Sequence, residues 1–375
     1  ARAPYPAHAL RSMDASSSPA LPDAAQILAD VERAIVEDLG TGDATASLLP
    51  ATARACARLT CRDAAVIAGT AWFDACFHRI DPATRIDWQV TDGQQVAAGS
   101  VICTLTGNAR ALVSAERPAL NFLQLLSATA TATAAHVACV AGTGARILDT
   151  RKTIPGLRLA QKYAVRCGGG HNQRMGLYDA ILIKENHIIA AGGIAAAVQA
   201  ARTLHPELPV EVEVETLDEL DQAIACAADR IMLDNFTLER MAEAVRRTAG
   251  RVPLEASGNI GLDNLRAYAE TGVDYISIGA LTKHIRAVDL SLRLEGRPTV
   301  SGAAVFIAPD HPDYPPTWLT RHYGVLCVGW PGVEAKVFPA GRPFGGKYRV
   351  WVHRGQPTPA ALRFVNVVPF SASVM

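Results

Sequence analysis

The chain has 375 residues, 49% of them hydrophobic, and its 36 basic and 36 acidic residues balance to a formal net charge of zero at pH 7. This length predicts two or three domains with packed cores. The neutral charge argues against a general nucleic-acid binder, which would carry a basic surplus. No uninterrupted apolar run reaches the ~20 residues that cross a bilayer, so we expect no membrane contact.

Residues 1–22 are rich in Pro, Ser and Ala and hold no apolar segment of signal-peptide length. They therefore predict a flexible leader rather than a secretion signal, and Met13 is a candidate for the natural start. The eight cysteines are scattered, with no CxxC pair and no cysteine–histidine set at zinc spacing. Isolated cysteines are typical of small buried residues in a reducing compartment, which predicts a cytoplasmic protein.

The first part of the chain predicts a mixture of helices and strands. Asp23 is placed to cap a helix. The apolar residues that follow it at helical spacing are Ile27, Leu28, Val31 and Ile35. Residues 54–113 predict short strands with glycine-marked turns. The Ala- and Leu-rich stretch 114–139 predicts a long helix, with Pro118 in the first turn, where a missing N–H costs little.

After residue 139 the pattern changes to a regular alternation of short apolar runs and helical stretches. The apolar runs are residues 145–149, 180–184, 210–214, 230–234, 252–257 and 274–280. The clearest helical stretches between them are Leu217–Ala227, Leu238–Thr248 and Leu262–Thr271. Strand, helix, strand at this spacing predicts parallel pairing through right-handed crossovers. Six such units form either an α/β barrel or a doubly wound sheet.

Polar residues follow every one of these strands, which favours the barrel. All the strand ends of a barrel meet at one rim, whereas in an open sheet only the strands beside the switch point converge. We therefore expect a flexible leader, an N-terminal α/β domain, a catalytic α/β barrel and a C-terminal tail of different composition. Their expected ranges are residues 1–22, 23–130, 131–296 and 297–375.

The rim of this barrel would gather both cations and acids. Its basic residues are Arg151, Lys152, Arg174 and Lys184, and its acids are Glu213 and Asp234. Cations that face one another repel strongly in a partly desolvated site, so such a cluster indicates a bound anion. The acids would hold Mg²⁺ or ribose hydroxyls. The rim therefore predicts a site for a small carboxylate beside a phosphorylated, magnesium-bound sugar.

Glycine-rich segments beside the rim strengthen the prediction of an anion site. Residues 168–170 are three consecutive glycines, whose bare backbone amides could approach a carboxylate or phosphate. The segments 257–261 and 277–280 follow the last two strands, where barrels commonly bind phosphate.

Other interpretations of the same residues stay open from the pattern alone. Residues 149–174 hold six Lys or Arg residues, which suit a solvated helix face, a nucleic-acid groove or a pocket for a small polyanion. Arg158, Lys162 and Arg166 recur every four residues, which predicts one exposed helix face. His171 and His187 are expected to be structural or peripheral. Glu211, Glu213 and Glu215 share one strand face, which in a barrel would be the crowded interior, so they need partners or a ligand.

Seven motifs between residues 23 and 295 resemble the quinolinate phosphoribosyltransferase family, also called nicotinate-nucleotide pyrophosphorylase (carboxylating). They occur in family order and spacing: AERPALNFLQLLSATAT, DTRKTIPGLR, KYAVRCGGGHNQRMGLYDAILIKENHI, VEVEVETLDEL, IMLDNF, EASGNI and GVDYISIGALT. Any one of them alone would be a weak signal.

The resemblance implies an N-terminal α/β sandwich domain and an incomplete six-stranded α/β barrel, the type II phosphoribosyltransferase fold. It implies transfer of phosphoribose from phosphoribosyl pyrophosphate (PRPP) to quinolinate with decarboxylation, giving nicotinate mononucleotide, CO2 and pyrophosphate in de novo NAD biosynthesis. It also implies Mg²⁺ as cofactor and a homodimer in which Arg117 reaches the neighbouring subunit's site.

The resemblance assigns roles to the rim residues by motif. Lys152, Lys184, Glu213 and Asp234 would be catalytic, and the two acids would also serve Mg²⁺, mainly through PRPP and water. The residues that it places against the substrates are Arg117, Thr150, Arg151, Lys152, Gln173, Arg174, Lys184, Glu213, Asp234, Ser257, Gly258, Asn259, Ile278, Gly279 and Ala280.

Gln173 departs from the family pattern, because many relatives carry His at this position. Gln keeps a hydrogen-bond donor but cannot carry the charge that an imidazolium would supply. The nearest alternatives are a phosphoribosyltransferase that uses nicotinate or nicotinamide, and the related protein associated with molybdate transport. An alternative of another class is a non-catalytic RNA-binding protein that uses residues 149–174, although no aromatic residues are interleaved with the cations there.

Residues 297–375 lie outside the resemblance and are rich in Pro, Gly, Trp and Tyr. Strand-like runs such as AAVFIA and YRVWVHRG predict a small β-rich module. The segment faintly resembles part of a β-sandwich family labelled methane-oxygenase-like. His311, His322 and His353 make a weak candidate for a metal site.

Overall fold

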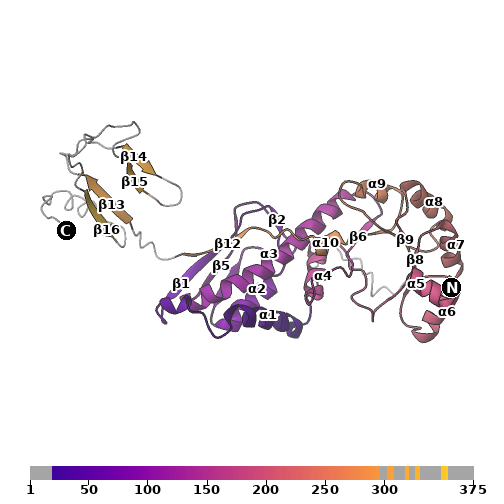
Figure 1. Ribbon diagram of the computed structural model, residues 1–375, viewed down its shortest axis with the longest axis horizontal. Helices are drawn as coiled ribbons and strands as arrows, with labels where there is room; N and C mark the ends of the chain where they lie inside the picture. The colour runs from indigo at the N-terminus through magenta and orange to yellow at the C-terminus, as the bar shows by residue number, and fades with distance from the viewer. Residues whose placement is uncertain (1–18, 296–301, 308–316, 321–325, 330–347, 354–375) are drawn as a thin grey trace, which may run out of the picture. The chain divides into compact units, whose positions relative to one another are not determined.

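The computed structural model describes residues 19–295, 302–307, 317–320, 326–329 and 348–353. The chain divides into two compact units, residues 1–294 and 295–375. The first unit contains an antiparallel sheet with its helices and a parallel sheet with its helices (Figure 1).

A four-stranded sheet forms the centre of the N-terminal part, with the strand order β12-β1-β5-β3. These strands are β1 (Arg54–Cys61), β3 (Arg85–Trp88), β5 (Ser100–Asn108) and β12 (Leu290–Glu295). Along β1, Ala57, Leu59 and Cys61 are buried at every second position, because one face of the sheet lies on the core. The short strands β2 (Ala65–Val66) and β4 (Gln95–Val96) pair separately.

Three helices pack with this sheet around one hydrophobic core. They are α1 (Ala24–Leu39), α2 (Thr70–Ile80) and α3 (Ala109–Cys139), and a single turn, η1, spans Ala46–Leu48. Asp23 caps α1 as predicted, because its side chain accepts a hydrogen bond from the N–H of Ala25. Of the four apolar residues at helical spacing, Leu28 lies outside the core, because it is 54% exposed. The core side carries the buried Asp30, which accepts a hydrogen bond from the indole N–H of Trp72 at 3.1 Å.

The short strands predicted over residues 54–113 are present as β1 to β5, but the prediction missed α2, which lies within this range. Its Trp72, Phe73 and Phe77 are fully buried, so tertiary packing of aromatic residues stabilises a helix here.

Helix α3 begins five residues earlier than predicted, directly after β5. Asn108 caps it by accepting from the N–H groups of Arg110 and Ala111. Pro118 therefore lies inside the helix, not in its first turn, and cannot donate to the carbonyl of Ser114. Among the described helices, α3 alone is long and apolar enough to span a membrane by length and composition, but half of that window is buried inside the protein.

The second sheet has six parallel strands in the order β6-β11-β10-β9-β8-β7. Its strands are β6 (Arg146–Leu148), β7 (Ile181–Ile183), β8 (Val210–Val214), β9 (Arg230–Asp234), β10 (Leu254–Ser257) and β11 (Tyr275–Ser277). From β7 to β11 successive strands are neighbours, and β11 pairs with β6, as in a barrel, so the opening lies between β6 and β7. This confirms the predicted incomplete α/β barrel.

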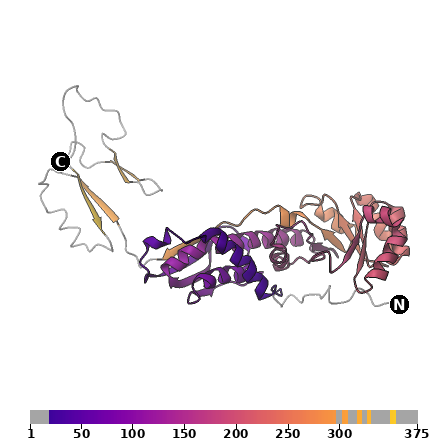
Figure 2. The same ribbon diagram turned by 60° about the horizontal axis from the view of Figure 1, so that its bottom comes forward.

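Helices cover the outside of this sheet (Figures 1 and 2). They are α5 (Glu185–Ala191), α6 (Ile194–Leu204), α7 (Leu217–Ala225), α8 (Leu238–Thr248) and α9 (Leu265–Glu270). Two further helices, α4 (Arg158–Cys167) and α10 (Ala280–Lys283), pack against α3. The alternation of strand and helix agrees with the sequence pattern. The expected domain boundary at residues 130 and 131 falls inside α3, which is continuous from the first sheet to the barrel.

In the C-terminal unit the structure describes two antiparallel strand pairs, as expected for a β-rich segment. The strands are β13 (Gly302–Ile307), β14 (Thr317–Thr320), β15 (Leu326–Gly329) and β16 (Tyr348–His353), with β13 paired to β16 and β14 to β15. His311 and His322 lie outside the described residues, and the description of His353 is limited to its backbone, so the weak metal hypothesis stays untested.

Candidate active site

The predicted rim residues gather at the carboxyl ends of the six parallel strands. Thr150, Arg151 and Lys152 follow β6, and Lys184 follows β7. The remaining strand ends carry Glu213 on β8, Asp234 on β9, Ser257, Gly258 and Asn259 at β10, and Ile278, Gly279 and Ala280 after β11.

Contacts between neighbouring strand ends join these residues into one mouth. The N–H of Ile278 donates to the carbonyl of Leu148 at 2.9 Å, which links β11 to β6. A Cβ at Gly279 would lie 3.1 Å from Lys152 Cδ, so the missing side chain leaves room for the lysine. The N–H of Asn235 donates to the carbonyl of Ser257 at 3.0 Å and links β9 to β10.

Lys184 and Glu213 form an ion pair across the ends of β7 and β8. The distance from Lys184 Nζ to Glu213 Oε2 is 2.6 Å. Burial raises the pKa of Glu213, the lysine opposes this shift, and repulsion from Asp234 adds to it. The two carboxylates are therefore close enough to repel each other, and a cation between them would relieve this repulsion.

Arg174 carries a buried donor that has no partner among the described residues. Its Nη1 donates to the carbonyl of Ala180 at 3.2 Å, but its Nε is buried and makes no hydrogen bond within the described part of the chain. Burial lowers the pKa of the guanidinium, and repulsion from Arg151 lowers it further. Two arginines that repel each other beside an unsatisfied donor fit an anionic ligand with several acceptor atoms.

The segment 171–174, which we call the seam segment, lies in the opening of the barrel. At one end His171 forms a parallel bridge with Leu148 of β6. At the other end Arg174 donates to Ala180, just before β7. Gln173 is buried, and its side-chain amide donates to Glu211 Oε2 on β8 at 2.9 Å. The seam segment therefore places Gln173 and Arg174 between the two edge strands.

The interior below the mouth contains a polar network, of which the sequence pattern indicated only Glu211. Arg230 Nη1 donates to Glu255 Oε2 at 2.9 Å, its guanidinium lies 4.4 Å from the ring centroid of Tyr275, and Ser277 donates to the same Glu255. Burial, and then Glu255, raise the pKa of Glu211 well above its usual range. The sequence contained a signal for this network, because alternate residues of each barrel strand point inward and several of these inward positions are charged.

The prediction that the three glycines form an anion-binding loop is wrong. The N–H groups of Gly168, Gly169 and Gly170 all donate to carbonyls of α4, at 3.0 Å each, so none of these amides is free for an anion. A Cβ at Gly168 would lie 2.3 Å from the carbonyl oxygen of Ala130. The missing side chain thus lets the end of α4 lie against α3.

The prediction of one exposed basic face on α4 is wrong at Lys162. This lysine is fully buried and pairs with Asp149, and Arg158 and Arg166 are half-buried. The spacing of four residues was correct for the helix, but a buried carboxylate on the barrel side draws the lysine inward. Helix α4 therefore does not present the row of exposed cations that a nucleic-acid groove needs.

The interpretation of the two histidines near the rim as structural or peripheral stays a prediction. His187 Nδ1 accepts from the N–H of Lys184 at 3.1 Å and so helps to cap α5. Burial lowers the pKa of His171. Arg117 is exposed on α3, and within the described residues no hydrogen bond joins it to the rim.

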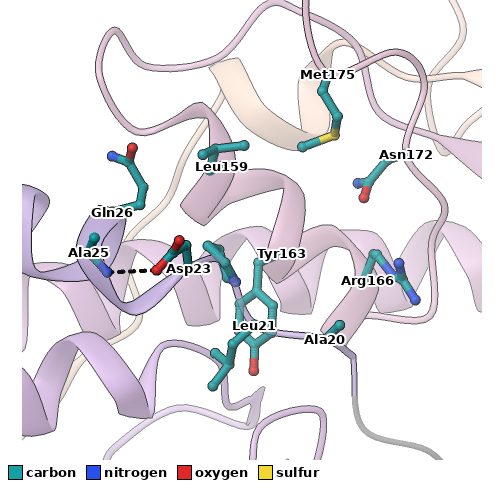
Figure 3. Close-up of a pocket in the computed structure, with 11 residues that line it drawn as sticks. Ala20, Leu21, Asp23, Ala25, Gln26, Leu159, Tyr163, Arg166, Asn172 and Met175 are labelled. Carbon is teal, nitrogen blue, oxygen red and sulfur yellow. Dashed lines mark hydrogen bonds between the residues drawn. The ribbon is translucent and has the colours of Figure 1, made fainter. Parts of the chain in front are cut away.

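A groove of about 660 Å³ lies beside the seam segment but does not include the rim. Figure 3 shows Leu159, Tyr163 and Arg166 from α4, with Asn172 and Met175 from the loop that follows. The start of α1 closes the other side. None of the predicted substrate residues lines this groove, so the mouth of the barrel remains the candidate active site.

An open α/β barrel whose mouth collects four cations around two carboxylates is the site of an enzyme that acts on small polyanions. Models of the N- and C-terminal domains of quinolinate phosphoribosyl transferase match residues 43–127 and 129–293. The chain belongs to this family of transferases. A third model, of a family of unknown function (DUF6807), matches residues 238–364. The methane-oxygenase-like resemblance of the tail stays a prediction.

Similar proteins cover the same part of the chain. A nicotinate-nucleotide pyrophosphorylase (carboxylating) from Mycobacterium leprae is 43% identical over 70% of this chain and 95% of its own length. A probable enzyme of the same name from Bacillus subtilis is 42% identical over 68% and 89%. The structure of the nicotinate-nucleotide pyrophosphorylase from Francisella tularensis aligns with a TM-score of 0.72 and 47% identity, over 75% of this chain and all of that one.

Proposed function

We infer that this chain transfers phosphoribose from PRPP to quinolinate with decarboxylation and forms nicotinate mononucleotide, CO2 and pyrophosphate for NAD biosynthesis. The observation that carries this assignment is the environment of Arg174. Its buried Nε has no partner among the residues that the structure describes, and its guanidinium is repelled by Arg151. A dianionic ring supplies acceptors for both arginines. A monocarboxylate would leave more of the positive charge unbalanced.

The residues of the mouth divide between the two substrates in this proposal. Arg151, Lys152, Arg174 and Lys184 hold the two carboxylates of quinolinate. Thr150 and Gln173 support this side: Thr150 Oγ1 accepts from the N–H of Lys152, and Gln173 lies next to Arg174. The PRPP side consists of Glu213, Asp234, Ser257, Gly258, Asn259, Ile278, Gly279 and Ala280.

Glu213 and Asp234 fit a magnesium ion that arrives with PRPP. They lie on adjacent strands and repel each other. Nowhere in the described residues do three His, Cys, Asp or Glu side chains form a metal cage. Proteins usually bind Mg²⁺ with one or two carboxylates, and phosphates of the substrate complete the coordination. When bound, the ion stabilises the charge that develops on the departing pyrophosphate.

The chemistry needs positioning and electrostatics rather than a nucleophilic side chain. The bond from the ribose to pyrophosphate breaks, and the pyridine nitrogen captures the oxocarbenium-like sugar. The ring nitrogen becomes cationic, so the electron pair left at C2 by loss of CO2 lies beside a positive charge before a proton replaces the carboxylate. Lys152 and Lys184 add to the field that stabilises this electron pair.

We also propose a homodimer in which Arg117 completes the neighbouring subunit's quinolinate site. Arg117 is exposed, and it lies on the part of α3 that packs with the N-terminal sheet. A partner subunit is the simplest source of an anion for this side chain. In this arrangement each active site would contain residues of both copies.

The decisive experiment measures nicotinate mononucleotide formed from quinolinate, PRPP and Mg²⁺, with nicotinate and nicotinamide as competing acceptors. We expect turnover with quinolinate and little with the other two. Preference for nicotinate would reject the assignment. RNA binding that is tight and salt-sensitive, without turnover of PRPP, would instead favour the RNA-binding alternative.

A further inference from the structure

A buried ion pair lies directly behind the mouth and has no role in the chemistry described above. Asp149 follows the last residue of β6, and Lys162 lies in the middle of α4. Both side chains are 0% exposed, and Lys162 Nζ is 2.5 Å from Asp149 Oδ1. Fully buried charges are rare in proteins, so this pair needs an explanation.

The pair joins three segments of the chain. Asp149 Oδ1 also accepts from the backbone N–H of Gln173 at 2.9 Å, and Oδ2 accepts from Asn172 Nδ2 at 2.6 Å. Lys162 Nζ donates to the carbonyl of Gln173 at 2.8 Å, and Asn172 Nδ2 also reaches the carbonyl of Lys162 at 2.9 Å. Strand β6, helix α4 and the seam segment therefore meet at one buried carboxylate and one buried ammonium.

These contacts hold the part of the barrel that lacks sheet pairing. The seam segment lies in the opening between β6 and β7, where no strand-to-strand ladder fixes the backbone. Its other links are the pairing of residue 171 with β6 and the side-chain bonds from Gln173 to Glu211 and from Arg174 to the carbonyl of Ala180. The next residue after Gln173 is Arg174, and Arg151 lies two residues after Asp149. The ion pair thus controls the spacing between the two arginines.

The charges themselves do not favour folding. Burial is the largest cause that raises the pKa of Asp149 to about 6, and burial is also the largest cause that lowers the pKa of Lys162. Both shifts go toward the neutral forms, so desolvation outweighs the attraction between the partners. A well-packed apolar pair would cost less, which points to a role in geometry rather than in stability.

We propose that Asp149 and Lys162 are positioning residues for the quinolinate carboxylates, because they fix the seam segment so that Arg174 lies opposite Arg151. The inference rests on the proposed function. It concerns only the quinolinate side of the mouth, since none of these contacts reaches the β9, β10 or β11 ends, which carry the PRPP residues.

The test compares steady-state kinetics of the full chain with those of the double variant Asp149→Asn/Lys162→Met. The double variant leaves no uncompensated buried charge, so it is expected to fold where either single variant is destabilised. We expect kcat/KM for quinolinate to fall about 100-fold, as for a misplaced binding group, and KM for PRPP to change less than about threefold. A purely structural pair would give normal kinetics in a double variant that folds.

A milder variant keeps the proposal testable if the double variant does not fold. Asn172→Ala removes one bond to Asp149 and leaves the ion pair in place. We expect it to raise KM for quinolinate about fivefold and to leave KM for PRPP unchanged. The matched control is Arg202→Met/Asp229→Asn, which removes a pair at the opposite ends of the strands and should leave both KM values unchanged.

The outcomes separate the inference from the proposed function. Equal loss for both substrates, or no loss for quinolinate in the folded double variant and in Asn172→Ala, would overturn the positioning role while the wild type stays active. Failure of the wild type to convert quinolinate would overturn the proposed function, and the positioning role with it.

Discussion

Protein carboxylates pair with only part of the positive charge at the mouth, and this determines the effect expected when a single cation is replaced. Lys184 has Glu213 as a partner, whereas the buried Nε of Arg174 has none within the described residues. A charge-assisted bond to a substrate carboxylate contributes about 1.5–3 kcal/mol, and Arg forms two such bonds at once. Removal of one cation therefore lowers the affinity for the transition state more than it lowers stability.

We predict that Arg151→Ala and Lys184→Ala each lower turnover of quinolinate at least ~100-fold, a loss of about 2.7 kcal/mol in transition-state stabilisation. Steady-state kinetics with saturating PRPP measure this. Arg85→Ala, at an exposed position of β3, is the control and should be normal. Near-normal kinetics in Arg151→Ala or Lys184→Ala would remove that residue from the site.

At the scale of single elements, the loop after β10 depends on a glycine that no other residue can replace without movement. Gly258 has φ +98°, and a Cβ there would lie 2.3 Å from Asn235 Oδ1 and 2.8 Å from the Asn235 backbone nitrogen. The ends of β9 and β10 can therefore lie this close together only because Gly258 has no side chain.

Gly258→Ala should raise KM for PRPP and lower the free energy of unfolding by about 1–3 kcal/mol, because it adds both strain and a clash. Gly99→Ala separates the two effects, since Gly99 has φ +84° but nothing within 4 Å of the added Cβ. Thermal unfolding and PRPP kinetics are compared for both. If the two variants change thermal unfolding and KM for PRPP equally, the contact with Asn235 does not determine the shape of the loop after β10.

The buried carboxylate of Asp149, directly after β6, should make the protein less stable as pH rises, which is opposite to the usual effect of a paired carboxylate. The pKa of Asp149 is raised to about 6 from an ordinary 3.8, so between these values the folded state holds a proton that the unfolded chain has lost. This group therefore lowers stability as pH rises from about 4 to 6, by about 3 kcal/mol in total.

The measurement is the free energy of unfolding from pH 4 to 7 for the wild type and for Asp149→Asn. The free energy of unfolding of the wild type minus that of the variant should decrease with rising pH and become constant above about pH 6. A difference that increases over this range would mean that the ion pair is net stabilising and would contradict the sign of the pKa shift.

Elements with a clear period were predictable, and contacts between elements were not. The six strands and their polar ends follow from local alternation, and the gathering of Arg151, Lys184 and Asp234 follows from the common rim of a barrel. The burial of Lys162 does not, because only the fold brings Asp149 to it. The prediction of a flexible loop at residues 168–170 failed for the same reason, because the contact that needs these glycines is with α3, about 30–40 positions earlier in the chain.

At the scale of the whole molecule, the proposed homodimer makes a prediction that one subunit cannot satisfy. Arg117→Ala and Lys184→Ala should each be inactive, since they damage the same site from two different chains. Mixed dimers of the two variants contain one doubly damaged site and one intact site. Random reassembly should therefore restore about a quarter of the wild-type activity.

Co-expression of the two variants, followed by assay of the purified mixture, measures this recovery. Co-expression of two copies of the same variant is the control. An active Arg117→Ala variant would show that Arg117 does not serve a quinolinate site. Two inactive single variants without recovery on mixing would show that Arg117 acts within its own chain.

The division of the chain into two units predicts that catalysis needs only the first. Every rim residue lies between Arg117 and Ala280, the family models match no residue beyond 293 for the two transferase domains, and β12 ends the first sheet at Glu295. A chain that stops after Gly296 keeps β12 and the core of its sheet. Since compact units with their own core fold independently, this truncated chain should retain kcat and both KM values within about twofold.

The truncated and full-length chains are compared in the quinolinate assay and by thermal unfolding. A first unfolding transition at the same temperature in both would show that residues 297–375 contribute no stability to the catalytic unit. A loss of activity greater than about tenfold in the truncated chain, with the same transition, would instead assign part of the catalytic function to the second unit.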